Sequence, residues 1–271
     1  MNLGHWSLDP SLAYVAIAAC LYVVGSRGRG RPTPLQATAF FASLVTIVIA
    51  MNSPIDSYAD QLFWVHMLQH VLLLTVAPPL FLLGRPWPRM WRALPLEVRT
   101  EVGRTIARSP WTAPIRKLAR PLPAFILFNA TILLWHIPGA YDATLTSGVV
   151  HVIEHAMFFF TGLLFWARVI DPGPLRPRLV WPARIAYVAG AMVVSWALAI
   201  TLVILPQPAY GYYATLASRP GGITALTDQQ LAAGVMWVLG SVAYTITFIV
   251  GFYKWLEPDK PANRSSAALT T

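Results

Sequence analysis

The segment QLFWVHMLQHVLLLTVAPPLFLL, residues 61–83, combines a length, an apolar composition and a histidine pair that together indicate the fold. At a rise of about 1.5 Å per residue, a helix of this length crosses a hydrocarbon core of about 30 Å. Pro78 and Pro79 in its second half predict a kink or an early end. We therefore expect a transmembrane helix that carries His66 and His70 in its first half.

The composition of the whole chain agrees with a membrane protein. Apolar residues make up 56% of the 271 residues and charged residues 11%, and the mean hydropathy is +0.55. A globule of about 270 residues still exposes about a quarter of the area of its unfolded chain. A chain this apolar therefore needs lipid as part of its solvent. The single cysteine, Cys20, excludes a disulfide scaffold, and the composition excludes collagen-like and disordered chains.

Six further apolar segments extend the prediction to an all-α, polytopic bundle of seven transmembrane helices that forms one domain, residues 1–271. Breakers such as Asn52-Ser53-Pro54 and Pro220-Gly221-Gly222 separate the segments. The predicted spans are 11–26, 35–51, 61–83, 122–137, 150–170, 184–205 and 230–256. A basic loop, 84–121, and a short basic tail, 257–271, complete the chain.

The basic residues predict the orientation of this bundle. Nineteen of the 20 Lys and Arg residues fall in alternate gaps between the spans, and Arg219 is the exception. By the positive-inside rule, the N-terminus is outside and the C-terminus is cytoplasmic. The net charge of +9 then divides into +14 inside, −4 outside and Glu154 within a helix. The basic balance therefore requires no nucleic acid as partner. Loop 84–121, with tryptophans among its arginines, either lies on an anionic membrane surface or only sets the topology.

This orientation places all six histidines in or above the outer leaflet, although they are spread over 150 residues of sequence. His66 and His70, and likewise His151 and His155, are four positions apart, which puts each pair on one face of its helix. Two such pairs on neighbouring helices supply four imidazoles to one metal ion. We therefore expect these four histidines to be metal ligands.

Other outer-side residues are candidates for further ligands or for groups that orient the imidazoles. They are His136, Met236, Asp228, Asp60 and Glu154. Thioether sulfur from Met236 would favour Cu(I), although methionine is also a common filler of apolar spans. Asp228 has a structural alternative, because Thr227 and Gln230 match a capping box at the start of the last helix. His5 and the other outer methionines stay open as ligands.

Two alternatives use the same histidines. The sequence HVIEH at 151–155 matches H-x-x-E-H, in which Glu154 would be the general base of a zinc-dependent membrane hydrolase. Its third ligand would have to be an outer aspartate, because Glu97, Glu101 and Glu257 are all predicted inside. Paired histidines also serve as axial ligands of haem, which would make the chain a membrane redox subunit.

Several motifs resemble those of a known family. They are NSPID at 52–56, FWVHMLQH at 63–70, APPL at 77–80, WHIPGAYD at 135–142, HVIEH at 151–155 and DQQLAAGVMW at 228–237. Together they are similar to the bacterial seven-helix CtaG family of assembly factors for the caa-type cytochrome c oxidase, and the resemblance extends over residues 35–256.

The resemblance implies a non-enzymatic protein of the bacterial plasma membrane that is needed to make active oxidase, through copper supply. Its partners would be oxidase subunits or a copper chaperone on the outer face. Combined with the histidine spacing, it predicts a copper-binding pocket in the outer leaflet, built from the third, fourth, fifth and seventh helices. Zinc is the alternative metal.

Overall fold

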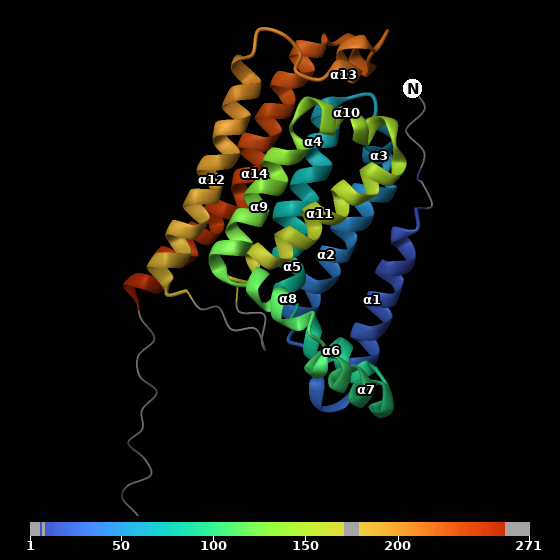
Figure 1. The fold of residues 1–271 in the computed structure, drawn as a ribbon, viewed down its shortest axis with the longest axis vertical. Coiled ribbons are helices and arrows are strands. Elements are labelled where there is room, and N and C mark those ends of the chain that lie inside the picture. Colours follow the sequence, from blue (N-terminus) through green and yellow to red (C-terminus); the bar gives the residue numbers. More distant parts are fainter. Residues whose placement is uncertain (1–5, 7–8, 171–178, 258–271) are drawn as a thin grey trace, which may run out of the picture.

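Helices account for all the regular structure in the computed structural model, which describes residues 6, 9–170 and 179–257 (Figure 1). Each predicted span coincides with a helix or a continuous helical unit. These are α1 (Ser11–Gly25), α2 (Pro34–Asn52), α4 (Phe63–Val71) with η2 (Leu72–Val76) and α5 (Ala77–Leu83), α9 (Pro121–Trp135), α11 (Gly148–Trp166), α12 (Trp181–Ile204) and α14 (Ala225–Leu256). Short helices between them include α3 (Pro54–Ala59), α10 (Pro138–Thr146) and α13 (Gly211–Thr215).

Five of these helical units are long and apolar enough to cross a membrane: α2, the unit α4–η2–α5, α11, α12 and α14. The apolar helices α1 and α9 have 15 residues each and are shorter. Helix α9 gives a sixth span only when it is joined to α8 (Thr112–Leu118), from which it is bent by 76°. Within the described ranges, the protein thus has five or six candidate spans, which identifies a multi-pass membrane protein.

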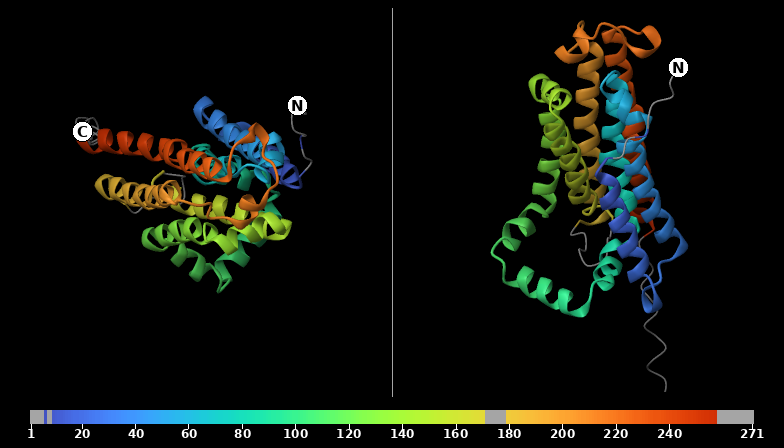
Figure 2. Two further views of the ribbon diagram at one scale, coloured as in Figure 1. Left: turned by 90° about the horizontal axis from the view of Figure 1, so that it is seen from above. Right: turned by 90° about the vertical axis from the view of Figure 1, so that its right-hand side faces the viewer.

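The unit α4–η2–α5 lies in the centre of the bundle. Of its apolar window 72% is buried, compared with 22–33% for the other four long spans. It packs against α3 and α14 through α4, and against α2 and α11 through α5. The outer helices present exposed apolar side chains such as Val193, Val238 and Ile249, as a lipid-facing surface requires. The view along the bundle shows these helices around the centre (Figure 2).

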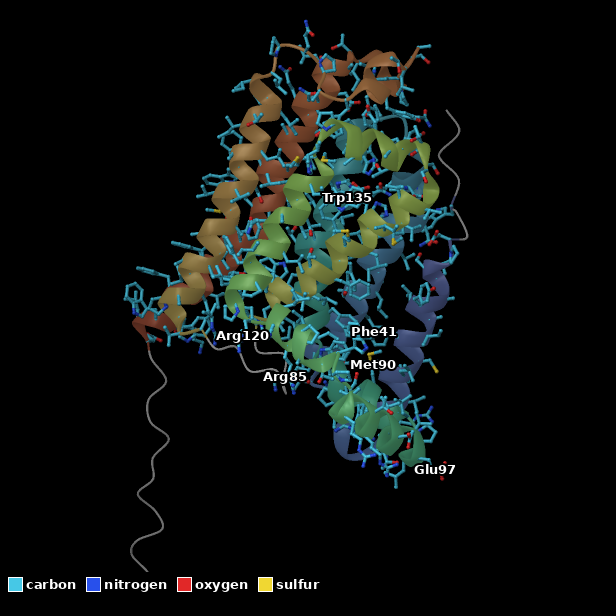
Figure 3. All side chains as sticks on the ribbon, in the orientation of Figure 1. Phe41, Arg85, Met90, Glu97, Arg120 and Trp135 are labelled. Atoms are coloured by element: carbon cyan, nitrogen blue, oxygen red, sulfur yellow. The ribbon has the colours of Figure 1, made fainter. Side chains whose placement is uncertain are left out.

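The short helices gather at opposite ends of the bundle. Helices α10 and α13 lie together at one end of the bundle, which we call the α10–α13 end (Figures 1 and 2). Helices α6 (Pro86–Ala93), α7 (Leu96–Arg108) and α8 lie at the other end, the α6–α8 end, where Arg85, Glu97 and Arg120 are labelled in Figure 3. The basic loop predicted at 84–121 is therefore largely helical.

Helices α7 and α8 have no buried residues, and Trp91 and Trp111 are exposed beside them. Arg89 in α6 is an exception to this exposure. It is buried and donates hydrogen bonds to the carbonyls of Gly30, Gly84 and Arg85. This side chain therefore ties the α6–α8 end to the bundle.

The helix does not end early near Pro78 but continues to Leu83, and the π-helical turn η2 directly precedes the proline pair. Proline has no N–H, so Pro78 leaves the carbonyl of Leu74 without its helical partner. The indole of Trp166 in α11 donates to that carbonyl at 3.1 Å. Gly162, one turn earlier in α11, allows this approach, since a Cβ there would lie 2.9 Å from the same oxygen. The proline pair thus becomes a packing contact between α5 and α11.

Helix starts follow local sequence signals, with one correction. Thr33 and Gln36 form a capping box at α2, and Pro34 occupies the first turn. The box predicted from Thr227 and Gln230 is wrong, because α14 begins three residues earlier with Thr224 as its cap. Asp228 therefore lies inside the first turn of α14, where its carboxylate is available to accept hydrogen bonds from another helix.

Candidate metal centre

Four buried side chains from two helices form one group near the centre of the bundle. Helix α4 contributes two and α11 contributes two, and each offers a ligand atom within 4.8 Å of the others. We call them the His/Glu group: His66, His70, Glu154 and His155. All four lie within the first eight residues of their helices, and both helices start toward the α10–α13 end. The i, i+4 spacing on α4 places both imidazoles on one face, as predicted.

Six polar atoms of the His/Glu group lack hydrogen-bond partners among the described residues. This holds for both oxygens of Glu154, both nitrogens of His70, and Nε2 of His66 and of His155. The Nε2 atoms of His66 and His70 lie 3.5 and 3.4 Å from the Glu154 oxygens. Buried polar atoms are costly when unpaired, and several converging on one point are rare in proteins. A bound cation would satisfy one ligand atom of each of the four side chains together.

Tyr213 determines which nitrogen of His66 is free to bind. Its hydroxyl donates to the carbonyl of Ala59, and its oxygen lies 3.3 Å from Nδ1 of His66. Burial raises the pKa of Tyr213 well above its ordinary value, so the hydroxyl keeps its proton. Because a carbonyl can only accept, the hydroxyl proton points to Ala59, and Nδ1 of His66 donates to the tyrosine oxygen. In the neutral imidazole, Nε2 of His66 then carries the lone pair, and this atom faces Glu154.

His151 is the one predicted ligand outside the His/Glu group. Its ring centroid lies 5.1 Å from that of His66 and 4.1 Å from that of His155, and the side chain is partly exposed. Glu154, expected only as a further ligand or supporting group, occupies the fourth position. A ligand role for His151 stays a prediction.

His136 lies beside the group at the end of α9, directly after Trp135, which is labelled in Figure 3. Its ring centroid is 6.3 Å from that of His70. Nδ1 lies 2.7 Å from the carbonyl of Ile132, and Nε2 lies 3.3 Å from Sδ of Met67. A cavity of about 40 Å³ lies beside this contact, and its lining includes Met67, His70, Ile132, His136 and Met236. His5 lies outside the described residues.

The two aspartates proposed as supporting groups lie away from the four donor atoms. Asp228 is fully buried, and its carboxylate accepts hydrogen bonds from the backbone N–H groups of Phe63 and Trp64 at the start of α4. The guanidinium of Arg219 lies 3.9 Å from the same carboxylate. Asp60 is exposed at the end of α3. Asp228 thus positions the helix that carries His66 and His70.

Aromatic residues that the sequence did not single out cover the group from the α10–α13 end. Tyr141 of α10 packs on Tyr210 with ring centroids 4.2 Å apart, and Phe63 packs on both. The Tyr210 hydroxyl donates to the carbonyl of His136 at 3.2 Å, and burial raises the pKa of this tyrosine. The carboxylate of Asp142 accepts hydrogen bonds from the backbone N–H groups at the start of α13, which fixes the segment next to Tyr210. Phe63 and Tyr141 fall in the motifs FWVHMLQH and WHIPGAYD, and the stretch PQPAYGYY at 206–213 contributes Tyr210.

Comparison with known proteins places this bundle and its histidines in a family. The sequence profile of the cytochrome c oxidase caa3 assembly factor (Caa3_CtaG) matches residues 13–257. The chain belongs to this family. The match confirms the resemblance inferred from the motifs, and it covers every helix that contributes to the His/Glu group.

Relatives in mycobacteria extend the comparison. An uncharacterized protein of Mycobacterium bovis and one of Mycobacterium tuberculosis are each 25% identical to the chain over 95% of its length. An uncharacterized protein of Mycobacterium leprae is 24% identical over 94%. The chain spans about two fifths of the length of these relatives, since it covers 40% of each. No solved structure matches the chain.

Proposed function

We propose that this caa3 assembly factor binds copper in the His/Glu group and supplies it to the copper centres of cytochrome c oxidase. The observation that carries the proposal is the convergence of four buried ligand atoms within 4.8 Å, with their lone pairs otherwise unused. Imidazole nitrogen suits copper as well as zinc, and copper binds nitrogen sites more tightly than other divalent metals of its row. Membership of an oxidase assembly family favours copper as the cargo.

The proposed setting is the bacterial plasma membrane, with seven spans and the N-terminus outside. Support comes from the agreement of α1 and α9 with two of the predicted spans, although each is short for a hydrocarbon core of about 30 Å. The basic helices α6 to α8 would then face the cytoplasm, and the α10–α13 end would face outward. The His/Glu group would lie in the outer half of the membrane, on the side of its proposed partners, an oxidase subunit or a copper chaperone.

Metal transfer makes and breaks only coordinate bonds, so the proposed function is non-enzymatic. Zinc-dependent hydrolysis with Glu154 as base is the competing function. It needs Glu154 beside a metal-bound water, whereas the Glu154 oxygens lie 3.5 and 3.4 Å from Nε2 of His66 and His70, which favours a role for Glu154 as a fellow ligand. Haem binding would need room for a porphyrin, and the neighbouring cavity of about 40 Å³ holds only a few waters.

The proposal is tested in a bacterial host whose own copy of the gene is deleted. We expect Glu154→Gln to reach the membrane in normal amount and to leave the oxidase without copper and inactive. Glu101→Gln is the matched control, because Glu101 is exposed on α7 and pairs with Arg104. It should restore oxidase copper to the wild-type level. A copper-replete oxidase in the Glu154→Gln strain would overturn the proposal.

A further inference from the structure

A second pair of ligand atoms lies next to the His/Glu group. Nε2 of His136 and Sδ of Met67 are 3.3 Å apart, and both side chains are buried. They come from α9 and α4, 69 residues apart in the sequence. At this distance Nε2 could donate a hydrogen bond to Sδ, but only if Nε2 carries the proton of the His136 ring.

The carbonyl of Ile132 fixes that proton. It lies 2.7 Å from Nδ1 of His136, and a carbonyl has no hydrogen to give, so Nδ1 must be the donor. In a neutral imidazole Nε2 is then an unprotonated lone pair. A thioether sulfur has no hydrogen either, so the short contact joins two acceptors. A soft cation between the two atoms removes the conflict.

We propose that Met67 and His136 form a second copper site, specific for Cu(I), which receives the ion from the His/Glu group through His70. A thioether with an imidazole is a ligand set that selects Cu(I). The cavity of about 40 Å³ has room for a dehydrated ion, and Met236 in its wall supplies a second thioether. This inference rests on the proposed copper function and adds the oxidation state and the route.

His70 connects the two sites. It belongs to the His/Glu group through Nε2, 3.4 Å from Glu154, and it also lines the cavity of His136 and Met67. Its Nδ1 has no hydrogen-bond partner within the described part of the chain. In the transfer, the bonds from copper to His66, Glu154 and His155 break while bonds to His136, Met67 and Met236 form, and His70 stays bound. The ion stays Cu(I) throughout, so no electron donor or acceptor is required.

The test uses the purified full chain, titrated with Cu(I) against a chromogenic Cu(I) chelator and examined by X-ray absorption. Wild type should bind two Cu(I) per chain and give a copper–sulfur scattering path. Met67→Leu should bind one and lose that path. The control Met192→Leu, at a half-buried methionine outside the cavity, should behave as wild type. Two Cu(I) with sulfur scattering retained in Met67→Leu would overturn the proposal.

Selenomethionine labelling provides a test that needs no folded variant. The X-ray absorption of the labelled wild type should show a copper–selenium path in place of the copper–sulfur path, and copper bound by nitrogen and oxygen alone would contradict the second site.

The variant His155→Ala separates this inference from the proposed function. It should lose one Cu(I) and keep the sulfur-bound one. Wild type with a single copper that lacks sulfur and is lost in His155→Ala would leave the proposed function standing and overturn the second site. A single sulfur-bound copper, unaffected by His155→Ala, would overturn the proposed function and leave the second site standing.

Discussion

The carboxylate of Asp228 in α14 accepts a hydrogen bond of 2.9 Å from the backbone N–H of Phe63, 165 residues earlier in the chain. A second bond, 3.0 Å long, comes from the N–H of Trp64. Helix α4 has Leu62 at its N-cap, which has no side-chain acceptor of its own. The last helix therefore caps the helix that carries His66 and His70, and a negative charge at a helix N-terminus is favourable.

Replacing this cap should weaken the fold and the site together. We expect Asp228→Ala to lower the free energy of unfolding by about 2 kcal/mol, since it leaves two buried N–H groups and Arg219 unpaired. Thermal unfolding in detergent measures the change, and copper titration should show a weaker site. Asp60→Ala, at an exposed aspartate, is the control and should stay within about 0.5 kcal/mol. Equal effects of the two variants would contradict the capping role.

Tyr213→Phe tests the orientation of His66. The variant removes only the hydroxyl that fixes the imidazole, so the chain should fold while its copper affinity falls by about 10- to 100-fold. Competition with a copper chelator measures the dissociation constant. Tyr212→Phe is the neighbouring control and should leave the affinity unchanged. Unaltered copper affinity in Tyr213→Phe would show that His66 needs no such partner.

Trp166→Phe tests how the bundle accommodates Pro78. Loss of the indole leaves the buried carbonyl of Leu74 unpaired and creates a small cavity, and we expect about 2–4 kcal/mol of lost stability. Trp196→Phe removes an indole bond to Ser241 between α12 and α14 at a less buried position, and it should cost clearly less. Chemical unfolding of both variants in one detergent provides the comparison. A smaller loss in Trp166→Phe than in Trp196→Phe would exclude the role given to this indole.

The proposed orientation is tested with single cysteines in a Cys20→Ser background. Ser218→Cys, exposed in the loop between α13 and α14, should react with a membrane-impermeant maleimide in intact cells. Thr105→Cys, exposed on α7, should react only after the membrane is opened. The reverse labelling pattern would invert the proposed topology.

Local patterns predicted the helices and the histidine cluster well. Apolar segments long enough to span a membrane coincide with helices because each such segment must satisfy its backbone internally. The four-residue spacing of His66 and His70 specifies one helix face regardless of the partner. The five histidines in the described part of the chain accordingly form one cluster, in which neighbouring ring centroids are 4.1 to 6.3 Å apart.

Local sequence patterns could not predict which neighbouring side chains of α11 join the His/Glu group. Glu154 and His151 lie about 60° apart around the helix, so the rotation of α11 relative to α4 decides which of them joins the group. That rotation depends on contacts such as Gly162 and Trp166 against Leu74, which involve a later part of α11 than its histidines. The roles of Tyr213 and Asp228 depend on partners 147 and 165 residues away, for which a single sequence contains no signal.

The most direct test of the copper proposal is to locate the metal in copper-loaded, purified protein by anomalous scattering at the copper edge. The account predicts a copper peak bound by His66, His70, Glu154 and His155, and no such peak in a His66→Ala/His155→Ala double variant. Zinc in place of copper, with Glu154 beside a metal-bound water, would contradict it, as would a copper peak that survives the double variant at the same position.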